Sequence, residues 1–412
     1  MRARRWSIST LVLVSLSAGD AQAQSALLSP FTEKLEADRA TLIELRRDIH
    51  RHPETSGKEE RTAGLVAERL RAAGYEVRTG VGGHGVIGVL RGGKPGPIVA
   101  YRADMDAVPS DDPDPVEFRS LTPGVRHICG HDVHTTIGVA MAQGFASIKD
   151  LLPGTVIFLF QPAEENATGA KAMLADGAFE RLKPDAIFAV HTAPFPVGHL
   201  VTAPGVLMSG RDLVRVTVQR APDEAATANA VRDRLLALST VTGPQVLAPS
   251  TPDFVFVQAQ VVAPSGADTT YAVEGSISMA SQQVRSRTHE AVTAAIAELR
   301  GDDTVLALQY EELNIAGVDN DTELVKRATS AVDSVLGAGS VSMLEQVVPA
   351  FSEDFGSFQA QVPGVMFFLG VSNPEKGTVG MPHSPGYVAD EESILVGAKA
   401  MAAVLLDFLE SR

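Results

Sequence analysis

Short apolar runs separated by amphipathic segments make up most of the chain. The runs that are apolar at nearly every position are typical of strands buried on both faces of a sheet. They lie at residues 98–101, 156–160, 186–190 and 365–369, with further strand-like runs at 75–79 and 86–90. Amphipathic segments with helical spacing lie at residues 33–49, 59–73, 137–148 and 392–409. This pattern predicts an α/β fold with a mostly parallel mixed sheet that is covered by helices.

The pattern changes near residue 206, where apolar and polar residues begin to alternate. Strict alternation predicts strands with one buried face, and it occurs at residues 213–218 and 254–261. Helical spacing occurs between and after these strands, at residues 223–238 and 287–299. Elements in the order strand, helix, strand, helix predict a small α+β domain.

The earlier pattern resumes after residue 317. We therefore predict one α/β domain made of two parts of the chain, with the α+β domain inserted between them. The predicted boundaries are a first part at 25–205, an inserted domain at 206–317 and a second part at 318–412.

The first 24 residues have the composition of a secretory signal peptide. Three arginines precede a short apolar stretch at residues 11–16, and Ala21 and Ala23 suit a signal-peptidase site. A membrane anchor is the alternative interpretation, but this stretch is shorter than the roughly 20 residues that a span needs. We therefore expect the chain to be periplasmic or secreted and its mature form to begin near Gln24.

The charge and the cysteine content exclude several classes of protein. The 412 residues include 35 Lys and Arg against 50 Asp and Glu, which gives a net charge of −15. Such an acidic chain is not expected to bind nucleic acid or an anionic membrane surface. Cys129 is the single cysteine, which excludes internal disulfides and a structural zinc site built from several thiolates.

Five clusters of polar residues carry the candidate chemistry. Four of them follow predicted buried strands, at residues 102–106, 161–165, 191–194 and 382–385. In open α/β sheets, ligands bind at the carboxyl ends of the strands. The fifth cluster, at residues 129–134, lies just before the predicted helix at 137–148. We therefore expect these distant segments to meet in one site.

The side chains in these clusters are those that bind first-row divalent metals. The candidate ligands are Cys129, His131, Glu165, His191 and His383. Thiolate, imidazole and carboxylate together suit zinc or a similar ion. Of the adjacent Glu164 and Glu165, one can bind a metal while the other takes a proton from metal-bound water. Asp106 can accept the N–H of a ligating histidine.

Several of these segments also resemble a known family. YRADMDAVP, CGHDVHTT, QPAEE, HTAP and PHSPGY, with RRDIHRHPE and FSEDFGSF, resemble the aminoacylase–carboxypeptidase family of metallopeptidases. Within that family they are most similar to the branch of hippurate hydrolases and auxin-conjugate amidohydrolases. The resemblance covers about residues 40–205 and 345–405. It implies a zinc-peptidase-like catalytic domain interrupted by a lid or dimerisation domain.

The resemblance also implies a role for each residue of the site. It implies two divalent metal ions held by Cys129, His131, Glu165, His191 and His383. It implies that Glu164 is the general base and that the substrate is an N-acyl amino acid or a short peptide, cleaved at its amide bond. The sequence does not choose between zinc, manganese, cobalt and nickel, because relative affinity and cellular supply decide which ion binds.

The expected lid departs from the family pattern. The family carries a GGHGA-type stretch after the first lid strand and later NVIP and GTVR segments, whereas here QRAPD follows Val218 and neither later segment occurs. In the family, the histidine and asparagine of these segments bind the substrate and the tetrahedral oxyanion, often across a dimer. The lid histidine here is His289, which we expect at the surface of a helix. Candidates to replace the missing donors are Arg211, Arg285 and Arg287. A homodimer is possible.

Two other functions stay open at this point. The altered lid is consistent with a catalytically reduced member that binds metal and a small molecule, although the complete set of ligands and base argues against it. A cysteine hydrolase based on Cys129 is a further alternative, but a nucleophile normally meets its base from elsewhere in the chain, and His131 is only two residues away. We therefore favour a metal-dependent amidohydrolase.

Overall fold

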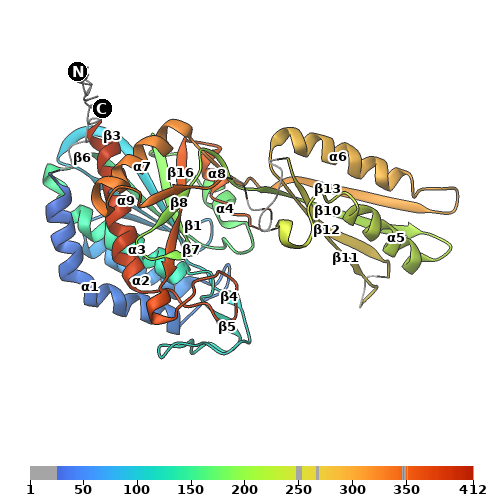
Figure 1. The fold of residues 1–412 in the computed structure, drawn as a ribbon, viewed down its shortest axis with the longest axis horizontal. Coiled ribbons are helices and arrows are strands. Elements are labelled where there is room, and N and C mark those ends of the chain that lie inside the picture. Colours follow the sequence, from blue (N-terminus) through green and yellow to red (C-terminus); the bar gives the residue numbers. More distant parts are fainter. Residues whose placement is uncertain are drawn as a thin grey trace, which may run out of the picture.

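A computed structural model describes residues 26–246, 253–265, 269–345, 347, 349 and 351–411. The expected signal peptide lies outside these residues. The chain forms two bodies at opposite ends of the long axis of the molecule (Figure 1). The small body consists of residues 210–315, and the rest of the described chain forms the large body. Two short strands join them, β9 (Gly205–Met208) and β14 (Val318–Asn320), which pair antiparallel.

The large body is built on an eight-stranded sheet with the order β1-β2-β6-β3-β7-β16-β8-β15. The central neighbours β6, β3, β7 and β16 run parallel, whereas β1, β2 and β8 pair antiparallel with their inner neighbours. This confirms the predicted mixed α/β sheet. The strand bounds are β1 Glu76–Val81, β2 Gly85–Arg91, β3 Lys94–Asp104, β6 Pro153–Gln161, β7 Ala186–Pro196, β8 Leu200–Thr202, β15 Val341–Met343 and β16 Gly364–Ser372. A separate two-stranded pair joins β4 (Val108–Pro109) to β5 (Val125–Arg126).

Helices cover both faces of this sheet. One face packs against α2 (Glu60–Ala72), α3 (His131–Ser147), α7 (Thr322–Leu336) and α9 (Glu392–Glu410), and α1 (Leu28–Arg51) packs against α3 and α9. The other face packs against the short helices α4 (Gly169–Ala175) and α8 (Gly356–Gln359). Along β6, Phe158 belongs to the first core and Ile157 to the second. Because both faces are buried, the central strands are apolar at nearly every position.

The small body is a four-stranded antiparallel sheet with two helices on one face. Its strand order is β11-β12-β10-β13. The helices pack against the sheet and against each other through residues such as Val231 and Val292. The element bounds are β10 Gly210–Arg220, α5 Glu224–Leu236, β11 Val255–Val262, β12 Ala272–Met279, α6 Gln282–Ala297 and β13 Val305–Ile315. The predicted boundaries at residues 206 and 317 stay a prediction, and β10 begins and β13 ends close to them.

The structure corrects three expectations about the elements. The small body has two further strands, β12 and β13, which the sequence analysis did not identify because glycine, serine and charged residues interrupt their apolar pattern. Helix α3 begins at His131 rather than at residue 137. Strand β7 continues to Pro196, so His191 lies within the strand and not after it. None of the helices in the described part of the chain is long and apolar enough to cross a membrane.

Candidate metal centre

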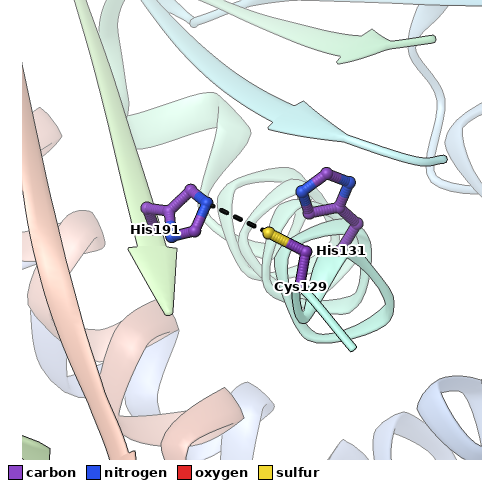
Figure 2. A group of neighbouring side chains, drawn as sticks. All are labelled: Cys129, His131 and His191. Atoms are coloured by element: carbon purple, nitrogen blue, oxygen red, sulfur yellow. Dashed lines mark hydrogen bonds between the residues drawn. The ribbon is translucent and has the colours of Figure 1, made fainter. Parts of the chain in front are cut away.

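The five predicted ligands meet at the carboxyl ends of the central strands. His191 lies on β7, while Cys129 and His131 lie at the start of α3, and Figure 2 shows these three side chains facing one another. Single ligand atoms of Cys129, His131 and His191 lie within 4.8 Å of one another, and so do those of Cys129, Glu165 and His383. The two groups share Cys129. Residues up to 254 positions apart (129 to 383) therefore form one site.

His191 and His131 each have one ring nitrogen engaged and the other directed inward. The Nδ1 of His191 lies 2.8 Å from the carbonyl oxygen of Thr192, so it donates a proton there. Its Nε2 then faces the Sγ of Cys129 at 3.4 Å (Figure 2). In the same way, the Nδ1 of His131 lies 3.2 Å from the Oδ1 of Asp106. Fixing the proton on Nδ1 leaves the Nε2 lone pair free for a metal ion.

The charge around the site favours a cation. Burial lowers the pKa of His131, but nearby Asp104, Asp106 and Glu165 outweigh burial and raise it to about 10. Burial also raises the pKa of the Cys129 thiol well above its ordinary value and that of Glu165 to about 7. Burial is the main cause of the shifts of Cys129 and Glu165, and the shift of His131 shows that several anionic groups surround it. A divalent cation would supply positive charge there and would favour the deprotonated ligands.

Glu164 and Glu165 occupy the turn that follows β6. The Oε2 of Glu164 and the Oε1 of Glu165 lie 3.8 and 3.7 Å from the Nε2 of His131. The backbone N–H of Glu165 donates to the Oδ2 of Asp106 at 2.9 Å, which fixes the turn. The preceding Ala163 has a φ of 53°, a left-handed conformation that is unfavourable for a residue with a side chain. Such local strain is found mostly where surrounding structure and function require it.

His383 reaches the site from the loop after β16. Its backbone N–H donates to the carbonyl oxygen of Ile128 at 2.8 Å, so the loop is tied to the segment that carries Cys129. Its Nε2 lies 3.5 Å from the Oε2 of Glu165. The side chain is 54% exposed, whereas the other four candidate ligands are largely buried. His383 also has a left-handed backbone, with a φ of 59°.

Gly130 allows Cys129 to approach β7. Its φ is 94°, and an added Cβ would lie 2.3 Å from the Oη of Tyr387 and 2.4 Å from the Oγ1 of Thr192. The hydroxyl of Thr192 donates to the carbonyl oxygen of Cys129 at 2.6 Å. The close approach of these backbones therefore depends on a residue without a side chain.

His134, to which the sequence analysis assigned no role, supports the site. The Nδ1–H of His134 donates to the Oδ1 of Asp104 at 2.6 Å, and its Nε2 accepts the backbone N–H of Thr192 at 2.8 Å. Both ring nitrogens are engaged, so His134 positions the site instead of binding a metal. The one signal in the sequence that points to His134 is its position one helical turn after His131 on α3.

A buried network around Arg102 lies beside the centre. The guanidinium of Arg102 binds the carboxylates of Asp104 at 2.6 Å and Glu353 at 2.7 Å, and it also contacts Asp354 at 3.3 Å. One ligand oxygen each of Glu164, Glu353 and Asp354 lies within 4.8 Å of the others. Glu353 and Asp354 belong to the FSEDF segment. Glu353 lies 251 residues after Arg102, so the spacing of residues along the chain does not predict that the two side chains pair.

The residues of the site fit a pair of first-row divalent ions. Two of the buried ligand atoms, His131 Nε2 and Glu165 Oε1, have no hydrogen-bond partner among the described residues. Buried polar atoms are nearly always paired, so these two atoms indicate a missing ligand. The donor set of one thiol, three imidazoles and a carboxylate is the set that zinc and its neighbours prefer.

A cavity of about 360 Å³ opens above these ligands. The large body contributes four of the five candidate ligands, all but His131, together with Glu164, and the small body contributes Arg211 and Ile315. Of the three arginines named above, Arg211 alone lines this cavity. Arg285 is buried in an ion pair with Asp212 at 3.0 Å, and Arg287 is 61% exposed. His289 lies half-exposed on α6 beside Glu312, as expected, and does not line this cavity.

Comparison with known proteins identifies relatives that align with most of this chain. The sequence model of peptidase family M20/M25/M40 matches residues 100–407. The chain is 32% identical over 386 residues to thermostable carboxypeptidase 2 of Saccharolobus solfataricus, covering 89% of this chain and 95% of the relative. It is 31% identical over 382 residues to IAA-amino acid hydrolase ILR1-like 5 of Arabidopsis thaliana, covering 89% and 86%.

Solved structures agree with these matches. The YXEP protein of Bacillus subtilis, described as a dinuclear metal binding peptidase, has a TM-score of 0.74 and 26% identity, covering 92% of this chain and 100% of that one. These matches confirm the family that the motifs predicted. The chain belongs to peptidase family M20/M25/M40, and it is a metal-dependent hydrolase of that family.

Proposed function

We propose that this hydrolase cleaves the amide bond of N-acyl amino acids or short peptides at a centre of two divalent ions. The proposal rests mainly on one observation: two neighbouring groups of ligand atoms share the Sγ of Cys129. The description of the Bacillus relative as dinuclear supports the same count. The ions would be held by Cys129, His131, Glu165, His191 and His383.

The substrate class follows from the relatives and from the cavity. Carboxypeptidases and IAA-amino acid hydrolases are named for cleavage next to an amino acid. A volume of about 360 Å³ accommodates a small molecule of that kind.

Glu164 is the proposed general base. When bound, the ions polarise the scissile carbonyl and lower the pKa of the attacking water. The carboxylate of Glu164 takes a proton from that water as its oxygen forms a bond to the carbonyl carbon. Glu164 then gives the proton to the leaving nitrogen as the C–N bond breaks, which releases an amine and a carboxylic acid. Burial and the neighbouring carboxylates raise the pKa of Glu164 well above its ordinary value, as suits a group that must hold a proton transiently.

Asp106 is the proposed positioning residue. It accepts the Nδ1–H of His131, the hydroxyl of Ser56 at 2.7 Å and the backbone N–H of Glu165 at 2.9 Å. One carboxylate thus orients a ligand from α3 and a ligand from the turn after β6.

Amino-acid release tests this function directly. The mature protein, supplied with Zn²⁺, Mn²⁺ or Co²⁺, is given a pool of N-acetyl amino acids and dipeptides. Glu164→Gln should abolish release while metal content stays unchanged, and a chelator should stop the wild-type reaction. The exposed Glu68→Gln is the matched control. Release by Glu164→Gln at the wild-type rate would reassign the base, and tight binding of a product without turnover would favour a binding protein.

We also propose that residues 1–24 direct export, on the composition described above. Expression in a bacterial host should yield periplasmic protein whose N-terminus, determined by mass spectrometry, lies near Gln24. Full-length protein retained in the cytoplasm would contradict export.

A further inference from the structure

Arg211 enters the cavity from the first strand of the small body. It lies near the start of β10, where it is opposite Ile315 of β13 and Ser278 of β12. Successive residues of a strand point to opposite faces. The next residue, Asp212, is fully buried on the other face, where it binds Arg285. The side chain of Arg211 therefore faces the metal ligands across the cavity, which it lines with Glu164 and His383.

The guanidinium of Arg211 lacks the partners that a half-buried cation normally has. Its Nε is buried and has no hydrogen-bond partner, and no carboxylate of the described residues lies within ion-pair distance of the group. Burial lowers its pKa, and the charge of Glu164 opposes that shift. The buried Arg102, in contrast, binds three carboxylates. Unpaired guanidinium donors that face a cavity indicate an anionic ligand there.

The nearby cationic groups of the small body are engaged or point elsewhere. Arg285 is bound to Asp212, Arg287 is exposed near Asp253, and His289 is paired with Glu312. Among the described residues that line the cavity, Arg211 is thus the cation that the small body supplies.

We propose that Arg211 is a catalytic residue that donates hydrogen bonds to the scissile carbonyl oxygen as negative charge develops on it. The proposal rests on the amide hydrolysis described above. When the water oxygen bonds to the carbonyl carbon, the π electrons move to the carbonyl oxygen, and they return as the C–N bond breaks. A guanidinium that lines the cavity opposite the candidate ligands can donate hydrogen bonds to this oxygen as its charge develops. The donor comes from the same chain as the ligands, so the site does not require a second copy for this role.

Kinetics of three variants test the proposal. Arg211→Met removes the charge and keeps the approximate volume, and Arg211→Lys keeps the charge without the planar fork. Arg215→Met is the matched control, because Arg215 lies on the same strand face but pairs with Glu274 at the surface. Arg211→Met should lower kcat by about 10²–10³-fold with KM nearly unchanged, as for removal of other oxyanion donors. Arg211→Lys should recover part of the rate, and Arg215→Met should match the wild type. Metal content and unfolding temperature establish that each variant is folded and loaded.

Other outcomes separate this proposal from its alternatives. A rise in KM at constant kcat, seen with an N-acetyl amino acid and absent with its carboxamide, would show that Arg211 binds the substrate carboxylate and would overturn the proposal. An unchanged kcat would overturn it too. If the wild type releases amino acids and Glu164→Gln does not, the proposed function holds whichever result Arg211→Met gives.

A binding measurement tests Arg211 without turnover. A phosphinic analogue of an N-acetyl dipeptide carries a tetrahedral anionic centre in place of the scissile amide. In calorimetric titrations of the metal-loaded protein, Arg211→Met should weaken its binding about 10²–10³-fold, and Arg215→Met should not. Equal affinity of wild type and Arg211→Met, or no binding to either, would overturn the proposal.

Discussion

The Oδ1 of Asp106 accepts the Nδ1–H of His131 at 3.2 Å, and this contact directs the Nε2 of His131 into the candidate metal centre. Loss of such a partner typically lowers metal affinity about 10–100-fold. We therefore expect Asp106→Asn to weaken Zn²⁺ binding by that factor in competition titrations with a chromophoric chelator. The exposed Asp150→Asn should bind as the wild type does. Undiminished affinity in Asp106→Asn would mean that the rest of the site orients His131.

Gly130 provides a test of close packing at the centre. Gly130→Ala places a Cβ 2.3 Å from the Oη of Tyr387, so the segment carrying Cys129 must move. Gly74→Ala is the control, since Gly74 also has a positive φ, of 83°, but open space around its Cα. Gly74→Ala should cost about 1 kcal/mol of folding free energy from backbone strain alone. Gly130→Ala should cost more and should also lose bound metal. Equal losses of stability in urea denaturation, with metal retained, would contradict this.

The Arg102 network should dominate the stability of the large body. Arg102→Met leaves three buried carboxylates without their cation, which typically costs about 3–5 kcal/mol. Arg91→Met breaks an exposed ion pair with Glu76 and should cost less than about 1 kcal/mol. Urea denaturation of the two variants measures the difference. A small loss in Arg102→Met would indicate that the carboxylates become protonated at little cost.

The stability of the metal-free protein should fall as the pH rises. The pKa of Glu165 is raised from 4.5 to about 7, chiefly by burial, so between these values the folded protein binds more protons than the unfolded chain. The raised pKa of His131 acts in the same direction, because its stabilising contribution is present below about pH 6.5 and is lost as the pH rises through about 10. Bound metal replaces these protons, so the stabilisation by metal should grow over the same range.

Unfolding temperatures with and without EDTA between pH 5 and 9 measure this effect. Glu165→Gln should flatten the pH dependence of the metal-free protein below about pH 7. A metal-free protein that becomes more stable across the whole range would show that the acidic groups of the centre do not govern its folding.

The parts of this fold that were predicted from sequence are those whose physical cause is local. A strand buried on both faces needs apolar residues at consecutive positions, so β3, β6, β7 and β16 are visible as apolar runs. Strands β12 and β13 lie in a sheet with one covered face, and their polar residues hide the pattern. The candidate ligands were predicted for a similar reason. Cysteine, histidine and paired glutamates stand next to strand ends, and the same segments carry the family motifs.

Only the tertiary structure decided which groups support the centre and which face it. The partners of Arg102 come from β3 and from a segment some 250 residues later, and no local pattern encodes that contact. His134 and His131 are both histidines of one helix, but their different neighbours leave a free ring nitrogen on His131 alone. Among the three candidate arginines of the small body, strand direction and burial place Arg211 in the cavity and pair Arg285 with Asp212. The sequence by itself thus determined the chemistry available to this protein, because residue types and short-range periodicity are local. The tertiary structure decided which of these side chains face the site and which support it, because hydrogen-bond partners, burial and orientation depend on residues that are distant in the chain.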